Sequence, residues 1–520
     1  MISNRKIEYG DFQTPMELCL AITAFLGDNG VLPDVVVEPT CGQGSFVKAS
    51  MDCFPAARLI YGFDVHSEYV DELRDGLPKE NGQKCRIEQR DFFHVNWADF
   101  FARVEGNLLV IGNPPWVTNA ALGALESQNL PQKTNFQGLN GFAAKTGKAN
   151  FDISEWMLIK ILEALNRKKA CLALLCKTST ARKTLRHAWV NHLNIGRASL
   201  HLIDAQKHFG VSVDACLLVI HTGLSEEAHV ASVYPGLSFE NKTFSIGLAG
   251  RDLVADIDEY LRLQDIDGIA YYAWRSGVKH DASSVMEFAR KPLAFVNGLG
   301  EECALETTFM FPLLKSSDIG NGRLVPRRWV LLTQRRPSDD TRQIETTAPR
   351  TWQYLVNHGA SLDKRRSIIY RKRARFAVFG VGEYTFAAWK VAISGFYKNL
   401  RFEAIGKHCG KPVVLDDTCY FISCDSELEA RFICELLNSD LCQRFLHSLV
   451  FTDAKRPITI DVLNRIDLKH LAEKLNKRKE AREHLSRTWA PEGRQMLLVS
   501  EEKRAYGAKT SGRNRPSRRT

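Results

Sequence analysis

The sequence lacks the paired cysteines that mark several classes of small metal-binding and redox domains. Its 13 cysteines include no Cys-x-x-Cys pair, so the common zinc and disulfide-exchange motifs are excluded. Cys171, Cys176 and Cys216 lie inside apolar runs, where a reduced thiol acts as a small hydrophobic group. We therefore expect reduced thiols, no metal and a cytoplasmic location.

Membrane and export signals are also missing. No apolar run reaches the roughly 18 residues of a membrane-spanning helix. Residues 1–6 lack the apolar stretch of a signal peptide. We expect no membrane partner.

The bulk composition indicates two folded units and is compatible with a polyanionic partner. The 520 residues exceed one ordinary domain, and 44% of them are hydrophobic, which suffices for real cores. The formal net charge is +10 and the pI is about 8.9. The location of this charge is more informative than its sum.

One stretch combines a strand with an unusual turn. Residues 108–111 are apolar and predict a buried strand, and residues 112–116 form its carboxyl-end loop. Open α/β sheets place their chemistry at such ends. Because proline has no N–H group, the Pro114 carbonyl and the Asn113 amide oxygen have few competing donors nearby. With Pro115 fixing the turn and Trp116 beside them, they suit a planar ring that carries an exocyclic amine.

Acidic residues end three earlier strands. Residues 35–38 predict a strand that ends at Glu38, and a turn with Gly42 and Gly44 leads into a helix. A carboxylate here suits an ammonium or hydroxyl group better than a pyrophosphate. Asp64 ends the next strand, at the spacing where such folds hold a ribose diol, and Asp91 follows the third.

Strands and helices continue to alternate up to residue 220. About seven strands are expected, with a strand pair at the end, which predicts an α/β fold with a doubly wound, Rossmann-like sheet. Beyond about residue 223 this rhythm is lost. We place the first domain at residues 1–235.

The turn at residues 113–116 resembles the (Asp/Asn/Ser)-Pro-Pro-aromatic motif of amino-methyltransferases. The order of motifs resembles the gamma class of DNA amino-methyltransferases of restriction–modification systems. The resemblance implies S-adenosylmethionine as cofactor, and catalysis by Asn113, Pro114, Pro115 and Trp116. It also implies N6-adenine as the methylated group, since Asn heads the motif in most adenine enzymes. Trp116 and Phe209 would stack on a base flipped out of the duplex.

The resemblance also implies where the cofactor is held. Thr14 and Pro15 would lie at its methionine end, and Asp91 and Phe92 would contact its adenine. The full set of expected cofactor contacts is Thr14, Pro15, Glu38, Gly42, Gly44, Asp64, Asp91 and Phe92.

A second, mixed α+β domain is expected at residues 250–467, followed by a basic helical or disordered tail at residues 468–520. Residues 310–319 are similar to a Pro-Leu-Leu-x-x-x-Asp-Ile stretch of target-recognition domains. The densest basic block is interleaved with aromatic residues, so we expect it to contact DNA phosphates. Its members are Lys364, Arg365, Arg366, Arg371, Lys372, Arg373 and Arg375.

The predicted partner is double-stranded DNA, with a separately encoded restriction endonuclease as a further candidate. Residues 117–150 predict either a substrate-facing loop or a floppy connection. Three enzymatic alternatives share the Asn-Pro-Pro-aromatic site: an N4-cytosine DNA methyltransferase, an RNA methyltransferase and a protein-glutamine methyltransferase. A DNA-binding module with a vestigial cofactor fold is the non-enzymatic alternative, but its glycines, strand-end acids and Asn113 should then have eroded.

Overall fold

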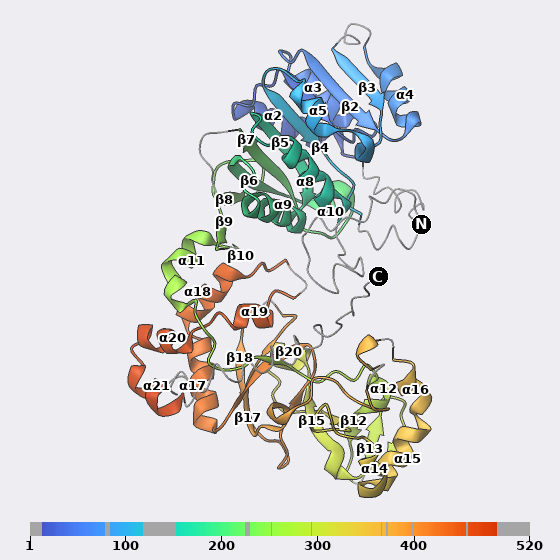
Figure 1. Cartoon of the computed structure of the whole chain (residues 1–520), viewed down its shortest axis with the longest axis vertical. Coiled ribbons are helices and arrows are strands. Elements are labelled where there is room, and N and C mark those ends of the chain that lie inside the picture. The colour runs from blue at the N-terminus through green and yellow to red at the C-terminus, as the bar shows by residue number, and fades with distance from the viewer. Residues whose placement is uncertain are drawn as a thin grey trace, which may run out of the picture. The chain divides into compact units, whose positions relative to one another are not determined.

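The computed structural model divides the chain into two compact units, Met1–Leu261 and Arg262–Thr520 (Figure 1). The residues that it describes are 13–78, 84–117, 152–223, 229–250, 252–292, 294–365, 367–370, 373–397, 399–453 and 456–485. The loop expected at residues 117–150 lies outside them, except for Val117. We describe each unit by itself.

The first unit is built on a ten-stranded sheet in the order β10-β9-β8-β6-β7-β5-β4-β1-β2-β3. Strands β1 to β5 are parallel to their neighbours in this group, and β7 runs antiparallel to β5 and β6. The strands are β1 (Val35–Glu38), β2 (Leu59–Asp64), β3 (Cys85–Gln89), β4 (Leu108–Gly112), β5 (Ala170–Lys177), β6 (Ile195–Ile203), β7 (Ala215–Thr222), β8 (Val230–Tyr234), β9 (Phe244–Ala249) and β10 (Asp252–Val254).

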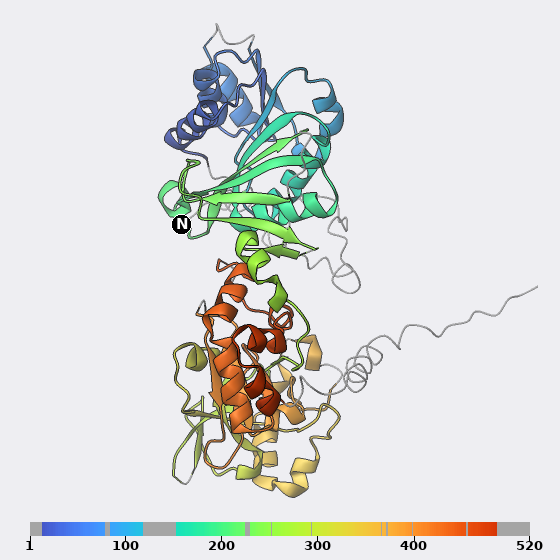
Figure 2. The same ribbon diagram turned by 90° about the vertical axis from the view of Figure 1, so that its left-hand side faces the viewer.

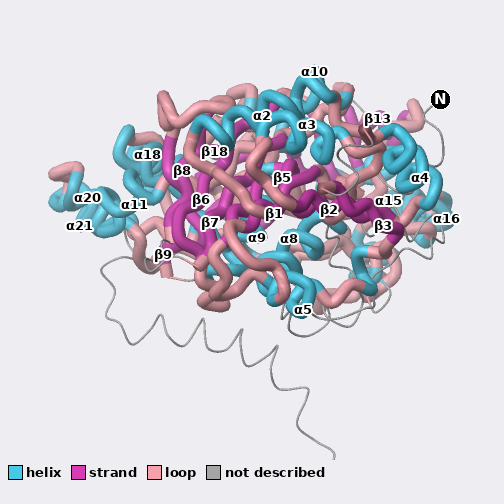
Figure 3. Tube along the Cα trace, turned by 90° about the horizontal axis from the view of Figure 1, so that it is seen from above, coloured by secondary structure: helices cyan, strands magenta, loops and turns pink. Residues whose placement is uncertain are grey.

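Helices cover both faces of this sheet, as the doubly wound prediction required. Figure 3 shows α2, α3 and α4 on one side and α5, α8 and α9 on the other. The central strands β1 and β4 are buried along their whole length, which explains their unbroken apolar sequence. The helices are α2 (Met16–Asp28), α3 (Ser45–Cys53), α4 (Ser67–Gly76), α5 (Trp97–Ala102), α8 (Ile153–Ala164), α9 (Thr178–Val190), α10 (Ala205–Phe209) and α11 (Ile257–Leu263), with a 3-10 turn η2 (Phe92–His94).

The sheet extends further along the chain than we expected. Seven strands form the α/β core, and β8, β9 and β10 add to its β6 edge. The sheet therefore continues to Val254, past residue 235. The sequence from 223 to 250 loses its α/β rhythm because β8 and β9 pair antiparallel without a helix between them.

The second unit is mixed α+β and contains two sheets. One has the order β11-β20-β17-β18, and the other β14-β13-β12-β16-β15-β19. The strands are β11 (Arg275–Ser276), β12 (Glu287–Arg290), β13 (Phe295–Asn297), β14 (Glu302–Cys303), β15 (Met310–Leu314), β16 (Arg328–Leu331), β17 (Trp389–Ser394), β18 (Phe402–Ile405), β19 (Val414–Leu415) and β20 (Cys419–Cys424).

Helix α17 packs on the smaller sheet, and the other carboxyl-terminal helices gather around it (orange to red in Figure 2). The helices of this unit are α12 (Ser283–Met286), α13 (Ser316–Gly320), α14 (Gln343–Thr347), α15 (Pro349–Asn357), α16 (Gly359–Asp363), α17 (Glu427–Leu437), α18 (Asp440–Leu449), α19 (Ile460–Leu463), α20 (Leu468–Lys474) and α21 (Arg478–His484); 3-10 turns are η3 (Gln264–Ile266), η4 (Thr307–Phe309), η5 (Ile368–Tyr370) and η6 (Glu383–Phe386).

The start of the predicted tail is part of this folded unit. We expected one charged helix from about residue 468 to 487, but α20 and α21 are separated by a break at Asn476, whose φ is 58°. Leu471, Ala481 and Leu485 are fully buried, so both helices belong to the core of the unit. Residues 486–520 lie outside the described part.

Candidate active site

The strand ends that carry acids and Asn113 meet at one cleft of the first unit. The cleft is open to solvent, and its empty space measures about 840 Å³ with the open solvent included. It is lined by Glu38 from β1, Asp64 from β2, Asp91 after β3 and Asn113 after β4. Side chains far apart in the sequence are brought together because parallel strands end at the same edge of the sheet.

The glycine turn between β1 and α3 is fastened to the end of β2. Gly42 and Gly44 have φ values of 50° and 78°, a region that other residues rarely adopt. A Cβ atom on Gly44 would lie 2.4 Å from the Leu73 side chain. The Asp64 carboxylate accepts the Gly42 N–H at 2.8 Å and the His66 N–H at 2.9 Å. The turn therefore has one fixed conformation at the cleft.

Glu38 is a buried acid beside this turn. Its side chain accepts the Val47 N–H at 3.0 Å, and the residue is only 3% exposed. Burial raises the pKa of the Glu38 carboxyl, the Val47 hydrogen bond lowers it, and the nearby charge of Asp64 raises it again, for a net increase well above the usual value. A cationic ligand in the cleft would favour the charged form of this group.

Aromatic residues and Asp91 form another part of the lining. Asp91 accepts the Phe93 N–H at 2.9 Å and contacts His94 Nδ1 at 2.8 Å, which fixes η2. Phe92 is buried and packs on Trp97, with ring centroids 5.0 Å apart. Phe93 also lines the cleft, although the sequence pattern did not single it out. The sequence alone does not show which ring of the adjacent pair Phe92 and Phe93 faces a ligand.

Other lining residues were also missed by sequence reasoning. They include Gln13, His66, Tyr69 and Met157. Gln13 accepts the Gln43 N–H at 3.0 Å, so its segment closes over the glycine turn. Gln13, Tyr69 and Met157 lie away from the strand ends in the sequence, and no spacing rule connects them to the cleft.

The turn after β4 places Asn113 against Thr14. The Asn113 amide nitrogen donates to the Thr14 hydroxyl at 3.2 Å, which fixes the plane of the amide. Gly112 has a φ of 154°, and a Cβ atom there would lie 3.3 Å from the Glu38 side chain. Pro115 lines the cleft and Pro114 is buried behind it.

Trp116, the next residue of this turn, contacts Phe209 at the end of α10. Their ring centroids lie 5.2 Å apart with an interplanar angle of 65°, an edge-to-face arrangement. Trp116 is 7% exposed. A base can lie between these two rings only after they separate. The two residues that the sequence predicted as a stacking pair are thus neighbours in the fold.

A partly buried ion pair supports the same turn. Lys177, the last residue of β5, donates to the Trp116 carbonyl at 3.2 Å and to the Asp152 carboxylate at 2.5 Å. The Ile153 N–H donates to the Val117 carbonyl at 2.9 Å. Asp152 also caps α8 through the Ser154 N–H. The start of α8 and the end of β5 thus hold residues 116 and 117 in place.

Comparison with known proteins gives this cleft its context. No family model matches the chain. The chain is 42% identical over 473 residues to the type II methyltransferase M.NspV of Nostoc sp. (strain ATCC 29411 / PCC 7524). This alignment covers 91% of this chain and 98% of that protein. The chain belongs to the type II methyltransferases. This family is part of restriction–modification systems, and its methyl donor is S-adenosylmethionine.

A solved structure shares the fold of this methyltransferase. The type IIL restriction–modification enzyme MmeI, solved in complex with DNA, aligns with a TM-score of 0.52 at 12% identity, covering 97% of this chain and 76% of MmeI. A methyltransferase subunit of a type I system from Streptococcus thermophilus aligns with a TM-score of 0.30 at 15% identity, covering 43% of this chain and 47% of that chain. The MmeI alignment extends the shared fold beyond the sheet with the cleft.

The cleft of the methyltransferase has the chemistry that S-adenosylmethionine requires. The cofactor carries an ammonium group, a ribose diol and an adenine amine, all of which suit acceptors. Glu38, Asp64 and Asp91 supply carboxylates to the lining. Among the described residues, no group of three or more His, Cys, Asp and Glu side chains could hold a metal ion. No helix in this part of the chain is long and apolar enough to cross a membrane.

The basic block of the second unit contains both exposed cations and cations that contact other groups of the unit. Arg365 turns inward, donating to the Leu362 and Ala377 carbonyls at 2.7 Å each. Arg375 pairs with Asp363 at 2.8 Å, and Arg373 donates to the Pro337 carbonyl at 3.1 Å. Of the remaining members, Lys364 is exposed, while Arg366, Arg371 and Lys372 lie outside the described residues. Arg365 and Arg375 are therefore engaged within the unit.

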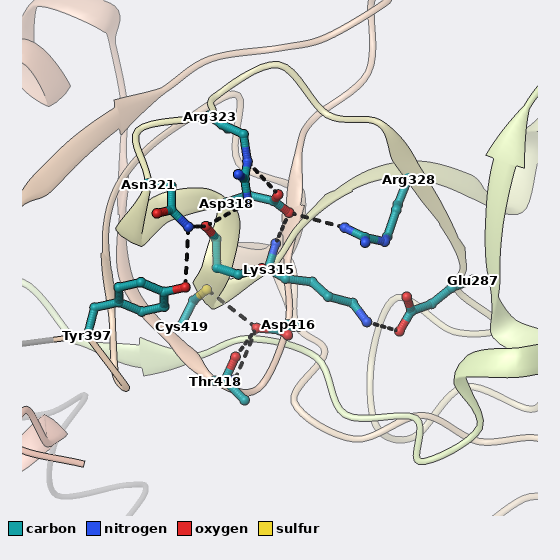
Figure 4. Close-up of polar contacts among 11 residues, drawn as sticks. Glu287, Lys315, Asp318, Asn321, Arg323, Arg328, Tyr397, Asp416, Thr418 and Cys419 are labelled. Atoms are coloured by element: carbon teal, nitrogen blue, oxygen red, sulfur yellow. Dashed lines mark hydrogen bonds and ion pairs between the residues drawn. The ribbon is translucent and has the colours of Figure 1, made fainter. Parts of the chain in front are cut away.

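The stretch that resembles a target-recognition motif forms β15 and α13. Asp318 accepts the Lys315 N–H at 3.0 Å and lies near two guanidinium groups, those of Arg323 at 3.6 Å and Arg328 at 3.5 Å (Figure 4). The Lys315 side chain pairs with Glu287 at 2.6 Å. One carboxylate thus balances two arginines at this place.

Proposed function

We propose that this methyltransferase transfers the methyl group of S-adenosylmethionine to the N6 amine of an adenine flipped out of double-stranded DNA. It would act in the cytoplasm as the modification enzyme of a restriction–modification system, with a separately encoded endonuclease as partner. The observation that carries the proposal is the Asn113 amide, held by Thr14 at the cleft beside Pro115. Membership of the type II methyltransferases supports DNA as the substrate.

The residues around the cleft would hold the cofactor. Glu38 and Asp64 suit its ammonium and hydroxyl groups, and Asp91 with Phe92 suits its adenine. Thr14 and Pro15 would lie at the methionine end, and Gly42 with Gly44 lets the backbone approach closely. When bound, S-adenosylmethionine supplies an electrophilic methyl group on a sulfonium sulfur.

The Asn113-Pro114 turn would activate the target amine. The lone pair of an exocyclic amine is conjugated into its ring, so the amine is a poor nucleophile. The Asn113 amide oxygen and the Pro114 carbonyl would accept its two N–H bonds, shift the nitrogen toward tetrahedral geometry and aim its lone pair at the methyl group. The proton leaves after the nitrogen becomes cationic, so no charged base is needed beforehand.

Trp116 and Phe209 would hold the flipped base. Extrusion costs a few kcal/mol, and stacking on aromatic rings returns about 1–3 kcal/mol per base. The edge-to-face contact of the two rings would open to admit the base. Adenine is favoured over cytosine because Asn heads the corresponding motif in most of the adenine enzymes that this turn resembles, and Asn113 stands at that position here.

The Asn113→Ala variant tests this role. Without the amide, methyl transfer should fall by at least about a hundredfold, in line with loss of one strong transition-state interaction. Binding of S-adenosylmethionine and DNA should remain, since neither depends on this acceptor. Turnover near that of the wild type would remove Asn113 from the mechanism.

A further inference from the structure

Three cations of the second unit lie on or next to strands of its six-stranded sheet, although they come from distant parts of the sequence. Arg290 ends β12, Arg335 follows β16, and Lys411 precedes β19. We refer to these three residues as the basic cluster. Among the described residues, none of the three side chains forms an ion pair with a carboxylate. Asp339 lies close by, but it accepts the backbone N–H of Arg335.

Aromatic rings and carbonyls hold the basic cluster in place. The Arg290 guanidinium lies 4.8 Å from the centre of the Trp329 ring, and that of Arg335 lies 4.9 Å from the Phe386 ring. Lys411 Nζ lies 5.0 Å from the Phe311 ring. Phe311 and Phe386 pack edge to face, with centroids 5.1 Å apart, so two of the three cations rest on one aromatic pair.

Backbone contacts fix Lys411 further. Its Nζ donates to the Met310 carbonyl at 2.9 Å and also to the Thr307 carbonyl. Ordering a lysine side chain costs rotamer entropy, and here that cost is met within the folded protein. The position of this charge is therefore set before any ligand arrives.

The charges of the basic cluster oppose one another. Burial lowers the pKa of the Lys411 ammonium, and the charges of Arg290 and Arg335 lower it further. Neighbouring arginines are compensated instead: Arg336 pairs with Glu383 at 2.7 Å, and Arg323 and Arg328 share one acid (Figure 4). Uncompensated like charges are unfavourable and are relieved by an anionic ligand.

We propose that Arg290, Arg335 and Lys411 form a site for the backbone phosphates of duplex DNA. The proposal rests on the proposed function, which makes DNA the substrate. A guanidinium over a ring keeps its N–H donors at its edge, where phosphate oxygens can accept them. Three cations from separate segments suit the repeated charges of a polymer, and phosphate contacts position a protein without reading sequence.

The salt dependence of DNA binding tests the site. The full-length triple variant Arg290→Gln, Arg335→Gln, Lys411→Gln is compared with wild type on a duplex of about 30 base pairs, from about 50 to about 200 mM salt. Each lost phosphate contact should reduce the slope of log affinity against log salt by about 0.9, so the triple variant should lose about 2–3 units. Affinity near 100 mM salt should fall at least about tenfold.

Two further variants keep the result interpretable. Arg336→Gln removes an equal charge from the same segment but one already paired with Glu383, and its slope should stay within about 0.3 of wild type. Arg335→Gln alone removes only an exposed side chain and should reduce the slope by about 0.9 even if the triple variant is poorly folded. S-adenosylmethionine binding should be unchanged in all of them.

The outcomes separate this site from the proposed function. A steep slope for wild type with an equal slope for Arg335→Gln and the triple variant would overturn the basic cluster as a phosphate site and leave DNA methylation standing. An equal reduction by Arg336→Gln would also overturn it, because net charge alone would then explain the effect. If wild type binds no duplex DNA, the proposed function fails together with the site.

Discussion

At the scale of single residues, the contact between Thr14 and Asn113 connects two motifs that the sequence presents separately. Thr14 precedes the first described helix, and Asn113 follows β4. The sequence predicted both as site residues, and their hydrogen bond became visible only in the folded chain. We therefore propose that Thr14 positions the amide of Asn113 in addition to lying at the methionine end of the cofactor.

Removing the Thr14 hydroxyl should affect turnover more than cofactor binding. In Thr14→Val the Asn113 amide loses a hydrogen bond worth about 1 kcal/mol, so kcat should fall by about five- to tenfold. Thr14→Ser keeps the hydroxyl and should stay close to wild type. Steady-state kinetics and S-adenosylmethionine titration separate the two effects. A Thr14→Val variant that loses cofactor affinity with unchanged kcat would contradict the positioning role.

At the scale of elements, Lys177 at the end of β5 should be needed to hold the turn that we propose to be catalytic. Lys177→Met removes the contacts to Asp152 and to the Trp116 carbonyl, and kcat should fall by about tenfold or more because the turn loses its orientation. Binding of S-adenosylmethionine should change little.

Lys183 provides a matched control for this experiment. Lys183 in α9 pairs with Glu155 of α8 at 2.8 Å, at a distance in sequence from the turn, and its side chain is 51% exposed. Lys183→Met should retain turnover near wild type. If both lysine variants lose turnover equally, the effect belongs to α8 and α9 packing and the role of Lys177 is refuted.

The cap of α15 should make the second unit sensitive to acid. Glu306 accepts the Thr351 N–H at 2.8 Å and the Arg350 N–H at 3.1 Å. Burial raises the pKa of the Glu306 carboxyl, but the hydrogen bonds from Thr351 and Arg350 outweigh this effect and lower the pKa to about 2. This stabilisation is complete above the unfolded pKa of about 4.3 and is lost as the pH falls toward about 2.

Urea denaturation measures this contribution. Glu306→Gln should lower the stability of the second unit by roughly 2–3 kcal/mol near pH 6, and the difference from wild type should narrow near pH 3. Circular dichroism follows the transition. A difference that stays constant between the two pH values would show that the Glu306 charge is not responsible.

At the scale of the whole molecule, the sequence predicted the α/β fold and the strand-end residues Glu38, Asp64, Asp91 and Asn113 that line the cleft. Strand ends are readable because a buried parallel strand has an unbroken apolar sequence and its end residue faces a common edge. The charge pattern was less informative. Residues 364–375 are dense in cations, yet Arg365 and Arg375 are engaged by carbonyls and Asp363. The density of cationic residues in a sequence does not show which of them already have partners in the fold.

The basic cluster could not be predicted from the sequence either. Arg290, Arg335 and Lys411 are isolated in the sequence, and the order of strands β12, β16, β15 and β19 places them on or next to one sheet. The extra strands β8 to β10 were also missed, because short antiparallel strands lack the α/β rhythm that identified the core.

The most direct test of the central claim is to identify the methylated nucleoside. The purified protein is incubated with methyl-labelled S-adenosylmethionine and unmethylated genomic DNA, with RNA and protein supplied in parallel reactions, and each product is digested. We expect label in N6-methyladenine of DNA. Label in N4-methylcytosine would contradict the adenine assignment, and label confined to RNA or protein would contradict DNA as the substrate.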